Sequence, residues 1–570
     1  MNHDRDIPAA LDMESKTAST HQLSMGLRAA SVLVGLTLSL MAGADTPPAL
    51  QQRGDVPSDV ELERAGAVIG TIDVDNQDIF DPRDPREDKA LYRLANRLHV
   101  ETRPELILQQ LLIKPGDRYS KRLLEESERI LRAERFFYDA SIVPVHYADG
   151  RVDLQVTTRD VWSLNPGVSF SRRGGKSTYG VEIEELNVLG RGVAIALSHK
   201  SGVDRDIRRL DFIDRHLFGT RLELLASYAN NSDGDERKLS LERPFYALDT
   251  HWAAAVSAGK LEREDTLYRL GEEADQFVER VRSFEAYAGR SGGVHDGWVN
   301  RWSWGLTVDD RRFDALTEPL SSLLVPEDRK LVYPWVGWEL IEDQFGTERN
   351  HDQIERTEDI FLGTRLQARL GYSSSGLGAD RNALVYHAEF DRGYALTPAS
   401  KLTFSSTLGG RREQRKSADV LLEGQARYYY EQDSNWLFFA SIDAGVGHAL
   451  DLDHQLLLGG DNGLRGYPLR FQSGDRRARL TLEQRYFTDW YPFRLFRVGG
   501  AVFFDAGRTW GDDPLDTPNY GLMKDIGVGL RFANSRSGLG SIIHVDLAFP
   551  LDGPDSIDNV QFLVETRREF

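Results

Sequence analysis

Arg465 is the residue of this chain whose type and surroundings point most clearly to specific chemistry. It lies in the stretch LLLGGDNGLRGY (456–467), where an apolar run stops at two glycines and a polar turn follows. A guanidinium presents its N–H donors in a planar fork that binds carboxylates in two places at once, which a lysine cannot copy. We expect this stretch to fold back so that Arg465 binds buried carboxylates; the alternative is an exposed loop cation.

Two acidic side chains are candidates for these carboxylates, because strand alternation turns both to the same side. Apolar side chains occupy most even-numbered positions of 480–486 and of 502–506. Successive side chains of a strand point to opposite faces, so Glu483 and Asp505 share the other face. The same alternation places Arg531 and Asp546 away from the apolar face.

A nucleophile motif is present but lacks its expected context. GRSGG (289–293) fits the Gly-x-Ser-x-Gly pattern around Ser291, with His295 four residues later. Such a serine needs a strand before it and a helix after it. The following VHDGWVNRW predicts a loop and then a strand, so a barrel serine hydrolase is kept only as an alternative.

Metal and nucleic-acid chemistry are not indicated. The chain has no cysteine, its 13 histidines are scattered without a His-Glu-x-x-His motif, and the aspartates at 73–78 lack the spacing of a calcium loop. We predict no catalytic residue, no cofactor and no metal site, and hence no enzyme. A formal net charge of −19 argues against nucleic acid as a partner, since phosphate binding needs a basic surface.

The N-terminal residues predict export. Arg28 precedes an apolar run that ends at Met41, and Ala42-Gly43-Ala44 then gives a small-x-small cleavage pattern. This is the anatomy of a secretory signal peptide. We predict an N-terminal extension and signal peptide over 1–44, with translation starting at Met25 and cleavage after Ala44. Residues 45–65, rich in proline and polar side chains, are expected to form a linker.

Residues 66–160 predict a small α+β domain with the order strand, helix, helix, strand, strand. Thr102 and Glu105 stand at capping-box spacing around Pro104, and Ser120 is placed to cap a second helix. Period-2 alternation over 151–159 predicts a strand with one buried face. The segments KPGDRYS (114–120) and GRVDLQVTTRDVW (150–162) resemble a polypeptide-transport-associated (POTRA) domain. That resemblance implies binding of extended client segments at an open sheet edge.

Residues 161–570 predict a transmembrane antiparallel β-barrel, so the fold class is mainly β. Short alternating stretches recur between polar loops over about 410 residues, which suits about 16 membrane strands. The last strand places Phe562, Val564 and Phe570 on one face. A terminal strand that ends in phenylalanine resembles the targeting signal of outer-membrane barrels.

Three ordered segments carry a closer resemblance. GGDNGLRGYP (459–468), TLEQRYF (481–487) and VFFDAGRTW (502–510) resemble the barrel of the BamA/TamA-type outer-membrane assembly factors, the "surface antigen" superfamily that includes FhaC-type two-partner-secretion transporters. The resemblance implies that a loop tip of Arg465, Gly466 and Tyr467 meets the lumen wall. It implies Glu483 and Asp505 as wall partners, with Phe503 and Gly507 completing a Phe-x-Asp-x-Gly pattern.

The expected function is to assist the insertion, assembly or translocation of other proteins at the outer membrane. The implied partners are outer-membrane lipid, extended client polypeptides in the periplasm, and an accessory periplasmic or inner-membrane protein. The implied location is the outer membrane, with the POTRA-like domain in the periplasm. A single POTRA-like unit favours an accessory or specialised member, and a passive structural barrel or pore is the alternative.

Overall fold

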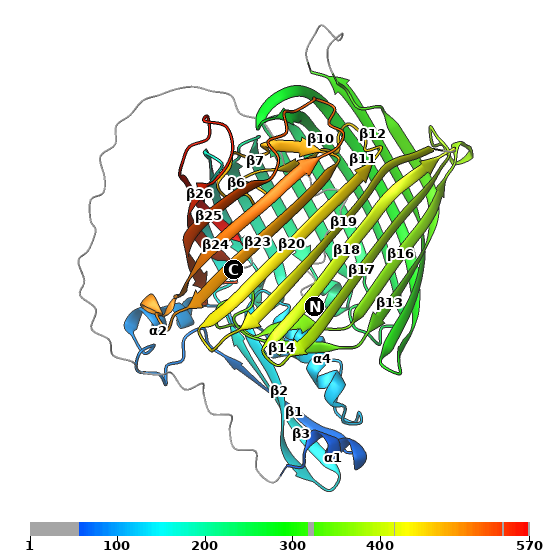
Figure 1. Ribbon diagram of the computed structural model, residues 1–570. Helices are drawn as coiled ribbons and strands as arrows, with labels where there is room; N and C mark the ends of the chain where they lie inside the picture. The colour runs from blue at the N-terminus through cyan, green and yellow to red at the C-terminus, as the bar shows by residue number, and fades with distance from the viewer. Residues whose placement is uncertain (1–55, 317–323, 415, 539–540, 568–569) are drawn as a thin grey trace, which may run out of the picture.

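A closed β-barrel with a small α+β domain at one end makes up the computed structural model (Figure 1). The structure describes residues 56–570 except 317–323, 415, 539–540 and 568–569. The expected signal peptide of residues 1–44 lies outside the described residues. We call the end of the barrel that contacts the small domain the near rim, and the opposite end the far rim.

Within the described residues, twenty antiparallel strands close the barrel, so the expected count of about 16 is wrong. In chain order the strands are β4 (Leu164–Arg173), β5 (Lys176–Glu185), β6 (Val193–Ser201), β7 (Asp206–Asp214), β8 (Glu223–Asn231), β9 (Gly234–Arg243), β10 (Trp252–Arg269), β11 (Glu272–His295), β12 (Trp298–Ala315), β13 (Arg329–Glu342), β16 (Thr364–Ser373), β17 (Ala383–Thr397), β18 (Ser400–Glu413), β19 (Lys416–Glu431), β20 (Trp436–His448), β23 (Arg476–Phe487), β24 (Phe496–Trp510), β25 (Met523–Asn534), β26 (Ile542–Pro550) and β27 (Gln561–Arg567).

Tight turns explain why the count was underestimated. Only Gly174 and Gly175 separate β4 from β5, with φ of +50° and +79°, and only Leu270 and Gly271 separate β10 from β11. Two positive φ angles in succession give a turn whose twist matches the flanking strands. The estimate of about 16 strands assumed that long outer loops take up much of the sequence. These two connections instead use two residues each.

The small domain has a three-stranded sheet with helices packed on it. Its elements are α1 (Asp59–Arg64), β1 (Val68–Gln77), α2 (Ala90–Leu98), α3 (Pro104–Gln110), α4 (Lys121–Arg132), β2 (Phe137–Ala148) and β3 (Arg151–Asp160). Strand β3 lies in the centre, parallel to β1 and antiparallel to β2. Its alternating residues Val152, Leu154 and Val156 are fully buried against Ile107 and Leu131 of the helices.

Three details of this domain differ from expectation. Helix α1 lies within the expected linker of residues 45–65, and its Leu62 is buried in the domain core. Helix α2 is an additional helix between the first strand and the two helices that the sequence predicts. Arg103, not Thr102, precedes α3, because the backbone N–H and hydroxyl of Thr102 both donate to Asp160, at 2.9 Å each.

Two short strand pairs stand apart from the barrel wall. Strands β14 (Phe345–Glu348) and β15 (Glu358–Phe361) form a hairpin in the connection between β13 and β16, at the near rim. Strands β21 (Leu456–Leu458) and β22 (Gln472–Gly474) pair at the base of the loop that carries Arg465. Neither pair was foreseen from the sequence.

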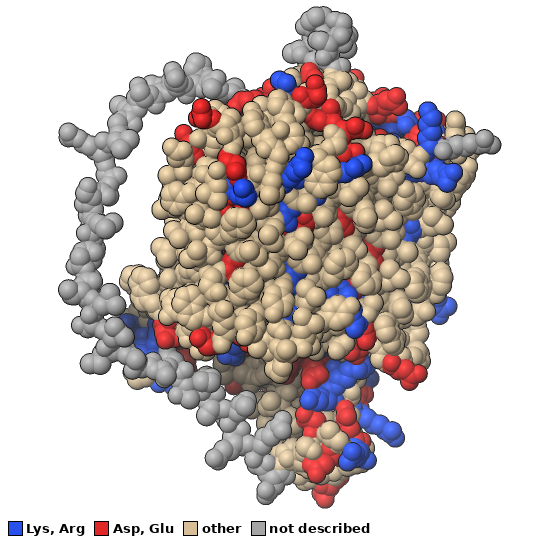
Figure 2. Space-filling model, in the orientation of Figure 1, with Lys and Arg blue, Asp and Glu red and all other residues tan. Residues whose placement is uncertain are grey.

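The outer surface of the barrel suits a lipid environment. Val502, Val528 and Leu530 are about half exposed, while Asp505 and Arg531 of the same strands are buried. On the face of the barrel that Figure 2 shows, a broad band carries few charged side chains, and charge is more frequent toward the two rims. None of the described helices is long and apolar enough to span a membrane.

The barrel closes where its first and last strands meet. Strand β27 pairs with β4 at one register position, Val564 with Arg172, whereas β26 and β27 pair from Ile542–Arg567 to Ala548–Gln561. The seam is therefore the most weakly paired boundary of the wall among the described residues.

Ion pairs fix the small domain to the near rim. The Arg132 guanidinium of α4 donates to both oxygens of Asp359 on β15, at 2.8 and 2.6 Å. Arg135 binds both oxygens of Glu184 on β5, at 2.8 and 2.9 Å. Each pair is bidentate, which fixes orientation as well as distance.

Candidate functional site

The loop that carries Arg465 folds back into the lumen and is held by its own polar side chains. The backbone N–H of Gly459 donates to Asn462 Oδ1, and Asn462 Nδ2 donates to the carbonyl of Leu457, both at 2.7 Å. The N–H of Gly460 donates to the carbonyl of Pro468 at 2.9 Å. These bonds close the loop and present Arg465 at its tip.

Arg465 contacts both carboxylates that strand alternation had placed inward. Its Nε and Nη2 donate to Asp505 at 2.7 and 3.0 Å, and its Nη1 donates to Glu483 at 2.9 Å. All three side chains are nearly or fully buried. The guanidinium carbon also lies 3.4 Å from the centre of the Phe503 ring. Arg465 therefore meets two carboxylates and one aromatic face, an arrangement that a lysine would not reproduce. We call Arg465, Glu483 and Asp505 the latch.

The two residues after Arg465 fit closely against β25 and β26. A Cβ atom added to Gly466 would lie 2.7 Å from Asp525 Cβ and 3.1 Å from Pro550 N, so a larger residue would push the tip off the wall. The Tyr467 ring is fully buried with Leu464 and Met523. Its hydroxyl lies 2.8 Å from the carbonyl of Lys524.

Gly507 leaves room on the wall for the incoming loop. A Cβ atom at this position would lie 3.0 Å from Leu458 Cδ2 and 3.4 Å from Leu464 Cδ2. The glycine of the Phe-x-Asp-x-Gly pattern thus lets the apolar base of the loop pack flat against β24.

Further charged residues extend the latch. Arg485 Nε donates to the second oxygen of Glu483 at 2.9 Å, and Arg531 pairs with Asp546. Asp546 lies 3.8 Å from Arg465, and Asp525 is paired in register with Asp505. The same alternation that identified Glu483 places Arg531 and Asp546 inward, but it gives no sign of which inward residues meet the loop tip.

The C-terminal residues divide between the two sides of the wall. Phe562 is exposed on the lipid side and Val564 is partly buried in β27. Phe570 is buried instead, with its ring 5.0 Å from that of Phe487 and its N–H donating to the carbonyl of Asp352. The expectation that Phe570 shares the face of Phe562 is not met, because Phe562 is exposed on the outer surface whereas Phe570 packs against Phe487.

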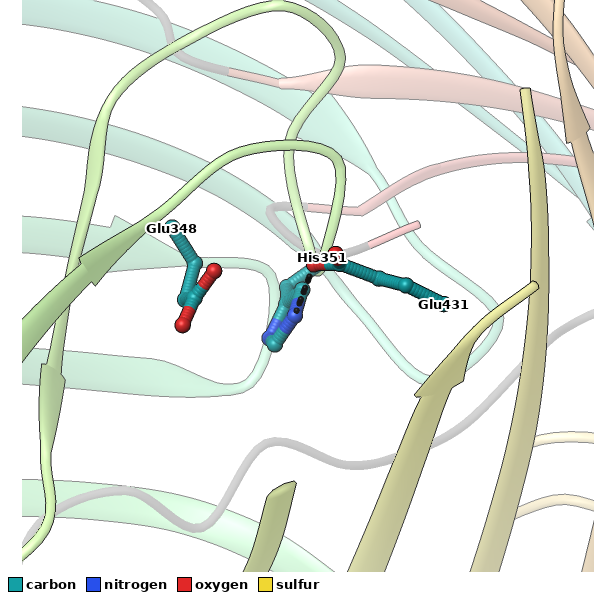
Figure 3. Close-up of side chains that lie close together, drawn as sticks. All are labelled: Glu348, His351 and Glu431. Atoms are coloured by element: carbon teal, nitrogen blue, oxygen red, sulfur yellow. Dashed lines mark hydrogen bonds and ion pairs between the residues drawn. The ribbon is translucent and has the colours of Figure 1, made fainter. Parts of the chain in front are cut away.

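A histidine and two glutamates gather where the β14–β15 hairpin meets the wall (Figure 3). One ligand atom each of Glu348, His351 and Glu431 lies within 4.8 Å of the others, and His351 Nε2 is 3.2 Å from Glu431. Lys401 Nζ lies 2.7 Å from Glu348 and supplies the positive charge there. The carbonyl of His351 accepts a hydrogen bond from Arg485 at 2.6 Å, so the hairpin is joined directly to the latch network.

The Gly-x-Ser-x-Gly segment does not form a nucleophile elbow. Ser291 lies within β11, its Oγ accepts a hydrogen bond from the N–H of Gly293, and β12 follows at Trp298. No helix follows the serine, which removes the structural context that the motif requires.

Comparison with known families identifies the C-terminal half of the barrel. Residues 362–567 match the Omp85 superfamily domain. This range contains the loop tip and all of its wall partners. The chain therefore carries an Omp85 superfamily domain, in agreement with the resemblance drawn from the sequence, and it is an outer-membrane protein.

Individual relatives are distant. A Treponema pallidum protein named as an outer membrane protein assembly factor is 29% identical over 162 residues, which is 25% of this chain and 19% of that protein. BamA from Haemophilus ducreyi lacking POTRA domains 1–3 is 12% identical, with a TM-score of 0.37 over 87% of this chain and 85% of that chain. CdiB from Escherichia coli is 13% identical, with a TM-score of 0.43 over 88% and 76%.

Proposed function

We propose that this outer-membrane protein assists the insertion, assembly or translocation of other proteins, and that its small domain is POTRA-like and faces the periplasm. The observation that carries the proposal is the docking of a small domain with an open sheet edge at the mouth of a barrel that holds an Omp85 superfamily domain. No chemical step is involved. The clients are extended segments of polypeptide.

The edge of β1 is the proposed receiving site. Beyond Ile69, β1 pairs only with β3 among the described residues, and Asp73 and Asp75 of this edge strand are exposed. Strand β2 suits an incoming strand less well. Its Pro144 has no N–H to donate, and the Ile142 N–H and the Ala140 carbonyl are already bonded to Glu128 and Arg132. An added strand gains main-chain hydrogen bonds whatever its sequence, which suits a factor with several clients.

A passive pore is disfavoured by what lies in the lumen. The loop bearing Arg465 fills part of it, and the β14–β15 hairpin and the small domain lie across the near rim. The weakly paired seam between β27 and β4 instead offers a lateral route from the lumen toward lipid.

Depletion of the protein tests the proposal. We expect the abundance of at least one other outer-membrane or surface protein to fall, and the wild-type chain to restore it. A photo-crosslinking residue at Asp73 should trap nascent outer-membrane proteins, whereas the same residue at Asp149, in the turn between β2 and β3, should not. An unchanged outer-membrane proteome on depletion would overturn the proposal. Equal crosslinking at both positions would remove the assignment to the β1 edge.

A further inference from the structure

Helix α2 carries an apolar face that no described part of the chain covers. Leu91, Leu94 and Leu98 are 70%, 48% and 64% exposed, and their spacing of three and four residues puts them on one side of the helix. Val100, directly after the helix, is 48% exposed. A contiguous apolar stripe on a rigid helix marks an interaction surface.

The opposite side of α2 is firmly attached to the barrel. Tyr92 stacks on Phe80 with ring centres 4.4 Å apart, and its hydroxyl donates to the carbonyl of Phe493 at 2.7 Å. Leu495 packs against the same cluster. Arg536 of the β25–β26 connection donates to the carbonyl of Ile79. The position of α2 is therefore set by the wall, beside the turn that joins β23 to β24.

That turn is itself apolar and exposed. Trp490 and Phe493 are 61% and 76% exposed, at the near rim of two strands whose outer faces are lipid-facing. Phe493 has φ of +56°, which non-glycine residues rarely adopt, and two other near-rim turns present Leu189 and Phe218 in the same way, with φ of +55° and +57°. Three near-rim turns with positive φ therefore each expose an apolar side chain at the same end of the barrel.

We propose that α2, with Trp490 and Phe493, is an interfacial membrane anchor that seats the small domain on the lipid leaflet at the near rim. Helix α2 lies beside the near-rim end of the barrel (Figure 1), so its exposed leucines extend the apolar surface offered by Trp490 and Phe493. Arg93 and Arg97 of the same helix are exposed on its polar side, with Arg97 nearest the leucines, and long cationic side chains in such positions reach lipid headgroups. Aromatic residues at this depth are typical of membrane interfaces.

Fluorescence in vesicles tests this anchor directly. Because the chain has no cysteine, Leu94→Cys and Val60→Cys can each carry a single nitrobenzoxadiazole label on the full-length protein. Val60 is 53% exposed on α1, at the end of the small domain away from the barrel (Figure 1), and is therefore the matched control. Both variants are folded into vesicles of phosphatidylethanolamine and phosphatidylglycerol.

We expect the label at position 94 to emit at shorter wavelength and to be quenched several-fold more by nitroxide-labelled lipid than the label at position 60. Aqueous iodide should quench the label at position 60 preferentially. Replacing Leu91 and Leu98 with Gln should shift the label at 94 toward water while the barrel keeps its resistance to SDS. Equal iodide quenching at both positions would overturn the proposal. So would shielding that depends on protein density in the membrane, which indicates a second copy, or shielding that appears only with added periplasmic protein.

Discussion

At the scale of single residues, the latch requires fork geometry as well as charge. Arg465 binds Asp505 through two nitrogens and Glu483 through a third, and all three side chains are nearly or fully buried. Arg465→Ala leaves the buried Asp505 without its cation, whereas Glu483 keeps its bond to Arg485. Removing one partner of a buried ion pair costs about 3–5 kcal/mol. We expect Arg465→Ala and Asp505→Ala each to lower the denaturation midpoint of the barrel in detergent, and the double variant to lie close to either single variant.

Arg465→Lys serves as the control for charge in this cycle, because it keeps the cation and loses the fork. We expect Arg465→Lys to restore only part of the denaturation midpoint that Arg465→Ala loses. Full recovery by lysine, or additive effects of the two alanine variants, would contradict a direct bidentate contact.

A substitution at Gly466 tests how closely the loop tip packs against the barrel wall. Gly466→Ala would place a methyl group 2.7 Å from Asp525 Cβ, and neither β25 nor the loop backbone has room to move without breaking the Tyr467 contacts. We expect the loop to leave the wall, measured as faster protease cleavage between 459 and 471. Gly409→Ala is the matched control, since its nearest neighbour would be His387 Nδ1 at 3.8 Å. Equal cleavage of the two variants would contradict the close approach.

At the scale of elements, the β14–β15 hairpin connects the small domain to the latch and carries a titratable residue. Burial, together with Lys401 and Arg485, lowers the pKa of His351 from its ordinary 6.5 to about 4, against the opposing effect of Glu348. The docked hairpin therefore binds fewer protons than the undocked one between these values. The contribution of His351 to docking is complete above pH 6.5, weakens as the pH falls and is lost below about 4.

Hydrogen exchange of residues 345–361 measures this contribution. Burial raises the pKa of Glu358 to about 8, so that residue favours docking as the pH falls and opposes the trend of His351. The effect of His351 is isolated as the difference between wild type and His351→Gln. We expect protection in wild type to fall more steeply between pH 6.5 and 4.5 than in the variant, while His146→Gln, at an exposed site, follows wild type. Parallel curves for wild type and His351→Gln would contradict the prediction.

The sequence predicts faces better than it predicts counts or connections. Alternation alone puts Glu483 and Asp505 inward, because the side-chain period of a strand is fixed by its backbone. The number of strands depends on turn lengths, and Gly174-Gly175 resembles many loop dipeptides. The β14–β15 hairpin and α2 are short, and their stability comes from packing against distant residues such as Arg485 and Phe493. The local sequence pattern does not reveal these distant packing partners.

At the scale of the whole molecule, both ends of the barrel are occupied by the chain itself. The latched loop extends inward from the far rim, and the hairpin and the small domain close the near rim. Between them lies a cavity of about 1030 Å³ lined by charged side chains such as Arg209, Glu236 and Arg479. A resting state of low conductance follows from this arrangement, although the wall alone has enough strands for a wide channel.

The ion pair between Arg132 and Asp359 holds the small domain against the near rim, and its two charges can be exchanged by mutation. Both side chains are less than a tenth exposed, so a like-charge contact there is poorly screened. In planar bilayers we expect small, rare openings for wild type, frequent large openings for Arg132→Asp and for Asp359→Arg, and a return to the wild-type record when both are combined. Restoration separates docking from misfolding, because two independently damaged elements would not repair one another. Arg64→Asp, on the exposed part of α1, should leave the record unchanged. If neither single variant alters conductance, the small domain is not what closes this end of the barrel.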